Sequence, residues 1–273
     1  MSEFEKDYLQ LLREVKYGGS YRDSRAGRTV SKFGIMLRDH SLRSRLFPLV
    51  TTRKIYHKPV LGELAAFING TSELVDFKAV GCNYWDMNAA QWPRNQGLDI
   101  NQMSVGRIYG VQWNDWNGVY NQLEGLVQGI KGNPFGRRHL LTTWNPSELD
   151  DMCLPPCHVL AQAYVTNDRH LDLCVYMRSV DLCLGLPSDV VLYSSFLVAL
   201  ATEVGLAPGS ITWMLGDAHI YENHLPLLEE QLHREPYPLP RYDYDGTDFM
   251  SFMPESLEIL DYQHHDPIVY RLN

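Results

Sequence analysis

The pair Cys157-His158, in the segment LPPCHV, is the part of the sequence best suited to nucleophilic chemistry. A thiol attacks carbon only as its thiolate, and neighbouring cationic groups favour that form. The two prolines before Cys157 restrict the backbone, so we expect the sulfur to point in a fixed direction. The pair also fits a buried structural cysteine, and its surroundings lack the glycine-rich cysteine signatures of proteases. By itself it leaves both interpretations open.

Several arginines stand beside predicted strands and could bind a phosphate monoester, because each guanidinium offers a planar fork to two oxygens. Any one of them would fit a surface salt bridge equally well. Arg178 is harder to explain in that way, since it ends an apolar run and precedes Ser179 and Asp181. The candidate set is Arg25 in DSRAGRT, Arg137 and Arg138 in GRRHLL, and Arg178 in YMRSVD.

The segment GDAHIYENH places His219 and Tyr221 two residues apart, hence on one face of a strand. Both side chains could reach a sugar hydroxyl. The alternative to sugar binding is a metal site built from Asp217, His219 and His224, but their spacing matches no common zinc pattern. We therefore predict no metal.

Asp189 is a lone carboxylate in the apolar stretch LGLPSDVVLYSSF. Burying a charge is costly unless a partner compensates it. One explanation is that Asp189 lies in the first turn of a helix, where the dipole and free amides favour an anion. The other is that Asp189 recognises a ligand.

Periodicity and turn residues predict the elements that must position these side chains. Helices are expected over residues 3–16, 58–70, 122–134 and 189–205, and strands over 29–40, 137–144, 158–166, 170–179 and 211–221. The tail beyond, rich in Tyr, Pro and Asp, is expected to be irregular. Helices and strands mix without a regular βαβ rhythm, which predicts a single α+β domain over residues 1–273.

Composition excludes several classes of protein. The formal net charge of −9 argues against a chain that coats nucleic acid, although a local arginine pocket for a small anion stays possible. Five cysteines form no disulfide framework or CxxC pattern, and the charged N-terminus has no apolar core of a signal peptide. No window reaches eighteen apolar residues, so we expect no membrane span and a cytoplasmic location.

The segments FPLVTTRK, LPPCH, VYMRSVDLCLGLP, GDAHIYENH and REPYPLP together resemble the thymidylate synthase family, in family order across almost the whole chain. The resemblance implies a mixed sheet with covering helices and a homodimer formed through the sheet. It also implies that 5,10-methylenetetrahydrofolate is the co-substrate, and that a cysteine attacks C6 of a pyrimidine nucleotide so that C5 accepts a one-carbon unit.

The resemblance assigns roles to individual residues. Cys157 would be the nucleophile, Arg178 would lower its pKa and contact the phosphate, Glu63 would organise water and proton transfers, and Tyr109 would lie near C5. The nucleotide would be held by Arg25, Arg178, Ser179, Asp181, Asp189, His219 and Tyr221, with Arg137 and Arg138 reaching across a two-fold interface. Trp85, Asp86, Asn88, Asp181 and Gly185 would contact the folate.

Two departures from the family pattern suggest a different substrate and product. Asp189 stands where thymidylate synthases carry the asparagine that identifies uracil, and a carboxylate can accept the amino group of cytosine instead. In YWDMN, Asn88 replaces an indole and Tyr84 an aliphatic residue, which would admit water to the reacting methylene group. Asp189, together with Met177 before the arginine, resembles deoxycytidylate hydroxymethylases.

The sequence therefore predicts an enzyme that converts dCMP or CMP to its 5-hydroxymethyl derivative. The alternatives are a cytidylate C5-methyltransferase, a thymidylate synthase that tolerates Asp189, and an inactive nucleotide- or RNA-binding regulator. The intact Cys157, Glu63 and arginines argue against the regulator.

Overall fold

The computed structural model describes residues 3–24, 26–246 and 248–271. Within these ranges the main sheet has six strands in the order β1-β2-β6-β5-β4-β3. All neighbours in the sheet are antiparallel except β5 and β6, which run parallel. Their connection passes through the long helix α7, as a parallel pair requires. The strands are β1 (Ser20–Ser24), β2 (Gly27–Asp39), β3 (Leu140–Thr142), β4 (His158–Val165), β5 (His170–Asp181) and β6 (Ala207–Tyr221).

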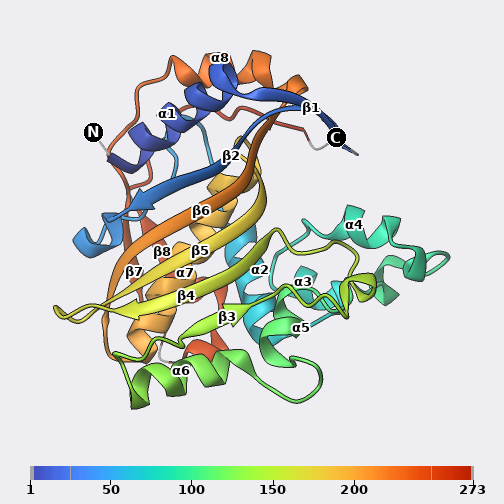
Figure 1. The fold of residues 1–273 in the computed structure, drawn as a ribbon, viewed down its shortest axis with the longest axis vertical. Helices are drawn as coiled ribbons and strands as arrows, with labels where there is room; N and C mark the ends of the chain where they lie inside the picture. The colour runs from blue at the N-terminus through green and yellow to red at the C-terminus, as the bar shows by residue number, and fades with distance from the viewer. Residues whose placement is uncertain (1–2, 25, 247, 272–273) are drawn as a thin grey trace.

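The helices cover one face of this sheet and its ends. Figure 1 shows α2 and α7 behind the sheet, α1 and α8 at one end of it, and α6 at the other. Helix α2 packs against α7, and both belong to the hydrophobic core. The helices are α1 (Glu3–Gly18), α2 (His57–Asn69), α3 (Leu74–Ala79), α4 (Asp86–Gln91), α5 (Tyr109–Asn114), α6 (Gln122–Gly132), α7 (Gly185–Glu203) and α8 (Leu225–Leu232).

Helix α7 is apolar on all sides because it lies between the sheet and α2. Its length and composition would also suit a membrane span, but 78% of its most apolar window is buried inside the fold. Leu186, Val190, Phe196 and Leu200 are each almost completely enclosed. Its hydropathy is thus explained by its place in the core.

The two faces of the sheet differ in a way that the register makes explicit. Leu37, Trp213 and Val175 occupy paired positions on the buried face. One residue earlier or later, the paired residues Met36, Met214 and Tyr176 lie on the opposite face and are 63%, 40% and 40% exposed. A row of apolar side chains therefore crosses the uncovered face of the sheet.

The α+β class and the single-domain organisation are confirmed, as are the long helices and strands. The expected strand over residues 137–144 is limited to Leu140–Thr142. The tail is less irregular than predicted, because β7 (Arg241–Tyr244) and β8 (Leu257–Leu260) form a small antiparallel sheet. Helices α3, α4 and α5 were not predicted, since six residues are too few to show a helical period.

Candidate active site

Cys157 lies immediately before β4 and is held through its own backbone and through the two prolines before it. Its carbonyl accepts the Arg178 amide at 2.9 Å, and its amide donates to the Tyr109 hydroxyl at 2.6 Å. The Arg178 guanidinium donates to the carbonyls of Pro156 at 2.7 Å and Pro155 at 3.0 Å. The proline segment, the arginine and the cysteine thus form one hydrogen-bonded unit.

The pKa of the Cys157 thiol is set by opposing influences. Burial raises it most, and the negative charge of Asp189 raises it further. The Arg178 charge and a hydrogen bond from Tyr109 lower it, and the net result stays above the ordinary value. Burial therefore favours the thiol form, while a cation and a hydroxyl lie in place to favour the thiolate.

Asp189 faces His158, and its position in α7 excludes the helix-capping explanation. The helix begins at Gly185, so Asp189 lies beyond the residues whose amides lack partners in the first turn. Its Oδ1 lies 3.1 Å from Nε2 of His158, and its side chain is 17% exposed. The Tyr193 hydroxyl, one turn further along α7, lies 3.0 Å from Nδ1 of His158.

A β-bulge directs His158 toward Asp189. The pairing of β4 with β5 shifts register between His158 and Leu160. Ala161 and Ala163 face the core, so strict alternation would turn His158 to the opposite face. The extra residue at the bulge reverses that direction, and His158 is only 6% exposed.

Glu63 approaches the same place from α2. Nε1 of Trp85 donates to its carboxylate at 2.8 Å. Burial raises the pKa of Glu63 to about 7, with the Trp85 hydrogen bond and His158 opposing the rise and Asp189 adding to it. A carboxyl group that titrates near neutrality can both accept and return a proton.

An aromatic layer joins these groups. The Tyr109 ring stacks on the His158 imidazole with centroids 4.4 Å apart, and meets Trp85 at 6.1 Å. The structure therefore brings together residues from six separate segments: Glu63, Trp85, Tyr109, Cys157, Arg178 and Asp189.

Residues predicted to hold the sugar and phosphate meet at the ends of β5 and β6. Ser179 pairs with Asp217 and Asp181 with His219 in the parallel register. The rings of His219 and Tyr221 lie edge to face at 5.3 Å. Arg137 and Arg138 are exposed just before the edge strand β3. The predicted phosphate ligand Arg25 lies outside the described residues.

The predicted folate side lies around α4 and the start of α7. Trp85 is buried, Asn88 is half-buried on α4, and Asp86 pairs with Lys78 at 3.2 Å. The other Asp86 carboxylate oxygen is buried with no hydrogen-bond partner. Gly185 separates two carboxylates, since a Cβ there would lie 3.7 Å from Oδ2 of Asp189 and 3.8 Å from Cβ of Asp181.

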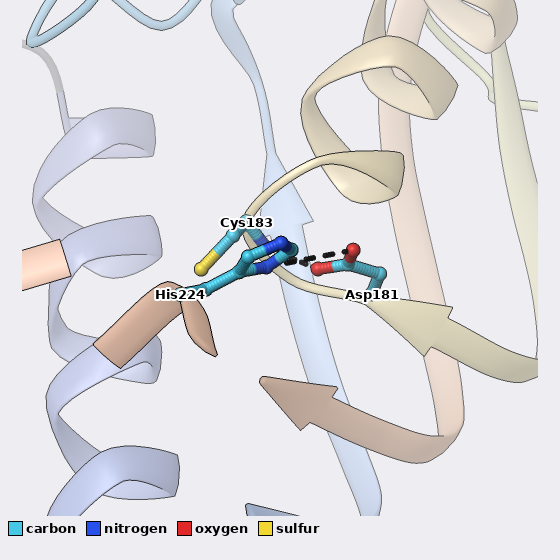
Figure 2. A group of neighbouring side chains, drawn as sticks. All are labelled: Asp181, Cys183 and His224. Atoms are coloured by element: carbon cyan, nitrogen blue, oxygen red, sulfur yellow. Dashed lines mark hydrogen bonds and ion pairs between the residues drawn. The ribbon is translucent and has the colours of Figure 1, made fainter. Parts of the chain in front are cut away.

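Asp181, Cys183 and His224 form the side-chain cluster drawn in Figure 2. Their potential ligand atoms lie within 4.8 Å of one another. Oδ1 of Asp181 already accepts the amides of Cys183 and Leu184, and Nε2 of His224 bonds the Arg271 carbonyl at 2.8 Å. Nδ1 of His224 lies 3.9 Å from Oδ2 of Asp181, so His224 connects the end of β5 to the C-terminal tail. The metal alternative required His224 to lie with Asp217 and His219. Instead, His224 groups with Asp181.

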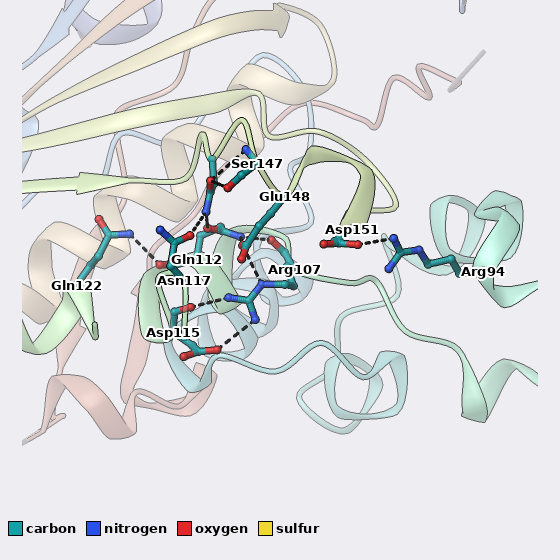
Figure 3. Close-up of polar contacts among 10 residues, drawn as sticks. Arg94, Arg107, Gln112, Asp115, Asn117, Gln122, Ser147, Glu148 and Asp151 are labelled. Carbon is teal, nitrogen blue, oxygen red and sulfur yellow. Dashed lines mark hydrogen bonds and ion pairs between the residues drawn. The ribbon is translucent and has the colours of Figure 1, made fainter. Parts of the chain in front are cut away.

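A polar network anchors the segments that carry Tyr109 and Cys157 (Figure 3). Arg107 donates to Glu148 at 2.8 Å and to Asp115 at 3.1 Å, and the Gln112 amide donates to Glu148 at 2.7 Å. Sequence reasoning missed this network because its members are scattered over forty residues. It also missed Tyr193, although the i, i+4 spacing from Asp189 places both on one helix face.

Residues 6–273 match the sequence profile described as thymidylate synthase. A curated thymidylate synthase of Mycoplasma pneumoniae is 37% identical over 284 residues, covering 96% of this chain and 98% of that protein. The chain therefore belongs to the thymidylate synthase family. It is a one-carbon transferase acting at C5 of a pyrimidine nucleotide, with 5,10-methylenetetrahydrofolate as co-substrate.

Proposed function

We propose that this enzyme converts dCMP or CMP to the 5-hydroxymethyl nucleotide. The observation that carries the proposal is the carboxylate of Asp189, paired with His158 at 3.1 Å beside the candidate nucleophile. The resemblance places an uracil-reading asparagine at this position in thymidylate synthases. Asp189 changes what the pocket can recognise.

The argument rests on the hydrogen-bonding edges of the two bases. Cytosine presents an amino donor at position 4 and an acceptor at N3, whereas uracil presents an acceptor at O4 and a donor at N3. A carboxylate accepts the cytosine amino group, and one shared proton can join it to N3. Uracil would set O4 against a carboxylate oxygen, and an unpaired buried polar group costs about 1–3 kcal/mol, more for a charge.

The proposed reaction uses the other groups in turn. The Cys157 thiolate adds to C6, and C5 then takes the methylene carbon, with tetrahydrofolate as leaving group. Loss of the C5 proton drives that departure and leaves an exocyclic methylene group on C5. Water adds to this methylene, and the electron pair returned to C5 expels the thiolate from C6, leaving a hydroxymethyl group. Glu63 has a pKa of about 7 and is therefore suited to accept and return the protons in these steps.

Two features support water, rather than hydride from the folate, as the final reactant. Asn88 is half-buried on α4, where the family pattern has a second indole. Tyr84 is 42% exposed, so solvent reaches this residue. We propose that the folate side is formed by Trp85, Asp86, Asn88, Asp181 and Gly185.

The nucleotide and the second subunit complete the proposed site. Arg178, Ser179 and Asp181 would lie toward the phosphate and ribose, with His219 and Tyr221 on the 3′-hydroxyl. The exposed row Met36, Met214 and Tyr176 would be covered by a second copy of the chain. Arg137 and Arg138, exposed beside edge strand β3, would then reach the neighbour's phosphate.

The second candidate is a thymidylate synthase that methylates dUMP, which the name of the Mycoplasma pneumoniae relative favours. A cytidylate C5-methyltransferase is the third. Mass spectrometry of the products from dCMP, CMP and dUMP separates all three, with dihydrofolate absorbance recorded during turnover. We expect a gain of CH2O on a cytidylate without dihydrofolate, whereas 5-methyl-dUMP with dihydrofolate would reject the proposal.

A further inference from the structure

We propose that His158, oriented by Tyr193, is a positioning residue that makes Asp189 selective for cytosine. The inference deepens the proposed function and rests on it. A carboxyl group alone does not exclude uracil. If Asp189 were protonated, its O–H could donate to O4 while its other oxygen accepted N3–H, so a carboxylic acid could imitate the asparagine amide. Something must prevent that arrangement.

The geometry leaves His158 little freedom. Its two ring nitrogens are engaged by Asp189 at 3.1 Å and Tyr193 at 3.0 Å, and Tyr109 stacks on its face. The Tyr193 ring meets it edge to face at 5.3 Å. With 6% exposure and the β-bulge beside it, the imidazole is held in one plane.

We assign the imidazole proton from these two contacts. Burial raises the pKa of Tyr193 well above its ordinary value, so its hydroxyl remains protonated. When that hydroxyl donates to Nδ1, the neutral ring carries its proton on Nε2. Nε2–H then donates to Oδ1 of Asp189.

This bond makes Oδ1 an acceptor only. In the proposed arrangement Oδ1 faces the group at position 4, so it accepts the amino group of cytosine with its second lone pair. The proton shared with N3 is confined to Oδ2, the oxygen on the Gly185 side. Uracil would put O4 against an oxygen that has no proton to give, because His158 occupies it.

The test compares two substitutions that differ in one hydrogen-bond donor. His158→Gln keeps an N–H donor at similar reach, and His158→Leu removes it. We measure kcat/KM for dCMP and for dUMP, with folding checked by circular dichroism. His158→Leu should lower the dCMP/dUMP ratio about 10- to 100-fold, while His158→Gln keeps it within about 3-fold of wild type. The dCMP/dUMP ratio of Tyr193→Phe should lie between those of the two His158 variants.

A second measurement reads the proton position in the wild-type protein. Nitrogen-15 NMR of histidine-labelled wild-type protein reports which ring nitrogen of His158 bears the proton, with the resonance assigned from the His158→Gln spectrum. We expect protonation at Nε2. A neutral ring protonated at Nδ1 would overturn the inference, because Asp189 would then be the donor.

The outcomes separate the two proposals. Wild-type enzyme that prefers dUMP rejects the proposed function and this inference with it. Wild-type enzyme that prefers dCMP, with an unchanged ratio in folded His158→Leu, rejects only the role of His158. Equal losses in the Gln and Leu variants would do the same, since they would indicate packing rather than hydrogen-bond donation.

Discussion

The backbone amide of Cys157 donates a 2.6 Å hydrogen bond to the hydroxyl of Tyr109, which also hydrogen-bonds the thiol. One phenol therefore holds both the main chain and the side chain of the candidate nucleophile. Tyr109 begins α5, and Arg107 just before it is tied to Glu148 on the segment that leads to Cys157. The position of the sulfur thus depends on contacts far from it in sequence.

Tyr109→Phe should make Cys157 less reactive. The substitution keeps the stacked ring but removes the hydroxyl that lowers the pKa of the thiol, and it leaves a buried amide unpaired. We expect alkylation of Cys157 by iodoacetamide at pH 8 to slow and turnover to fall about 10- to 100-fold. Peptide mapping identifies Cys157 among the five cysteines. Alkylation at the wild-type rate would show that the hydroxyl has no influence on the sulfur.

Asp189→Asn should have the opposite effect on the thiol. The charge of Asp189 raises the pKa of Cys157, so its removal should lower that pKa. The measurement is the pH dependence of Cys157 alkylation, whose midpoint should move to lower pH. Asp243→Asn on β7 is the matched control and should leave the midpoint in place. A midpoint that does not move in Asp189→Asn would mean that the carboxylate is screened from the sulfur.

Glu63→Gln should change how stability depends on pH. The pKa of Glu63 is about 7 in the fold, above its ordinary value of 4.5, so the folded state holds this proton more tightly than the unfolded chain. Stability contributed by the group is complete below pH 4.5 and is lost as pH rises toward 7. Glutamine does not titrate, so Glu63→Gln does not lose stability in this way as pH rises.

We therefore expect the free energy of unfolding of Glu63→Gln, relative to wild type, to increase by up to about 1.4 kcal/mol per pH unit between pH 5 and 7. Urea unfolding at several pH values measures the difference. Glu255 is exposed, so Glu255→Gln provides the control, and its stability should depend on pH in the same way as that of wild type. A difference between Glu63→Gln and wild type that is constant with pH would contradict the raised pKa.

The uncovered face of the sheet should form the dimer. Met214→Glu puts a charge in the centre of the exposed row beside Tyr176 and Met36. Burying that charge in a dimer would be costly, so the variant should sediment as a monomer at concentrations where wild type is a dimer. Lys32→Glu, on β2 away from this row, tests whether charge alone matters. A Met214→Glu dimer would place the interface elsewhere.

The same interface predicts complementation between inactive variants. Arg138→Ala lacks the arginine offered to the neighbour, and Cys157→Ser lacks the nucleophile. In a mixed dimer one site would have both residues, so an equal mixture should recover about a quarter of wild-type activity after subunit exchange. Activity that does not return would indicate that Arg138 serves its own subunit.

The sequence by itself determined the long elements and the chemistry-bearing residue types. The helix over residues 3–16, the strands that became β2, β4, β5 and β6, and the core helix α7 follow from periods that a dozen residues can display. Cys157, Arg178 and His219 were found because local motifs carry them. The short helices α3–α5 and the pair β7–β8 could not be predicted, because four to six residues show no reliable period.

Only the tertiary structure decided which of these residues face one another. Asp189 stands out in the sequence as a charge in an apolar helix, but its partner His158 lies on strand β4 and is turned inward by a bulge of one residue. The apolar row across the sheet likewise depends on the pairing register of β2, β6 and β5. Local pattern sets the period of a strand or helix, whereas register, bulges and crossovers set the direction of each side chain, and those are determined by packing between segments far apart in the chain.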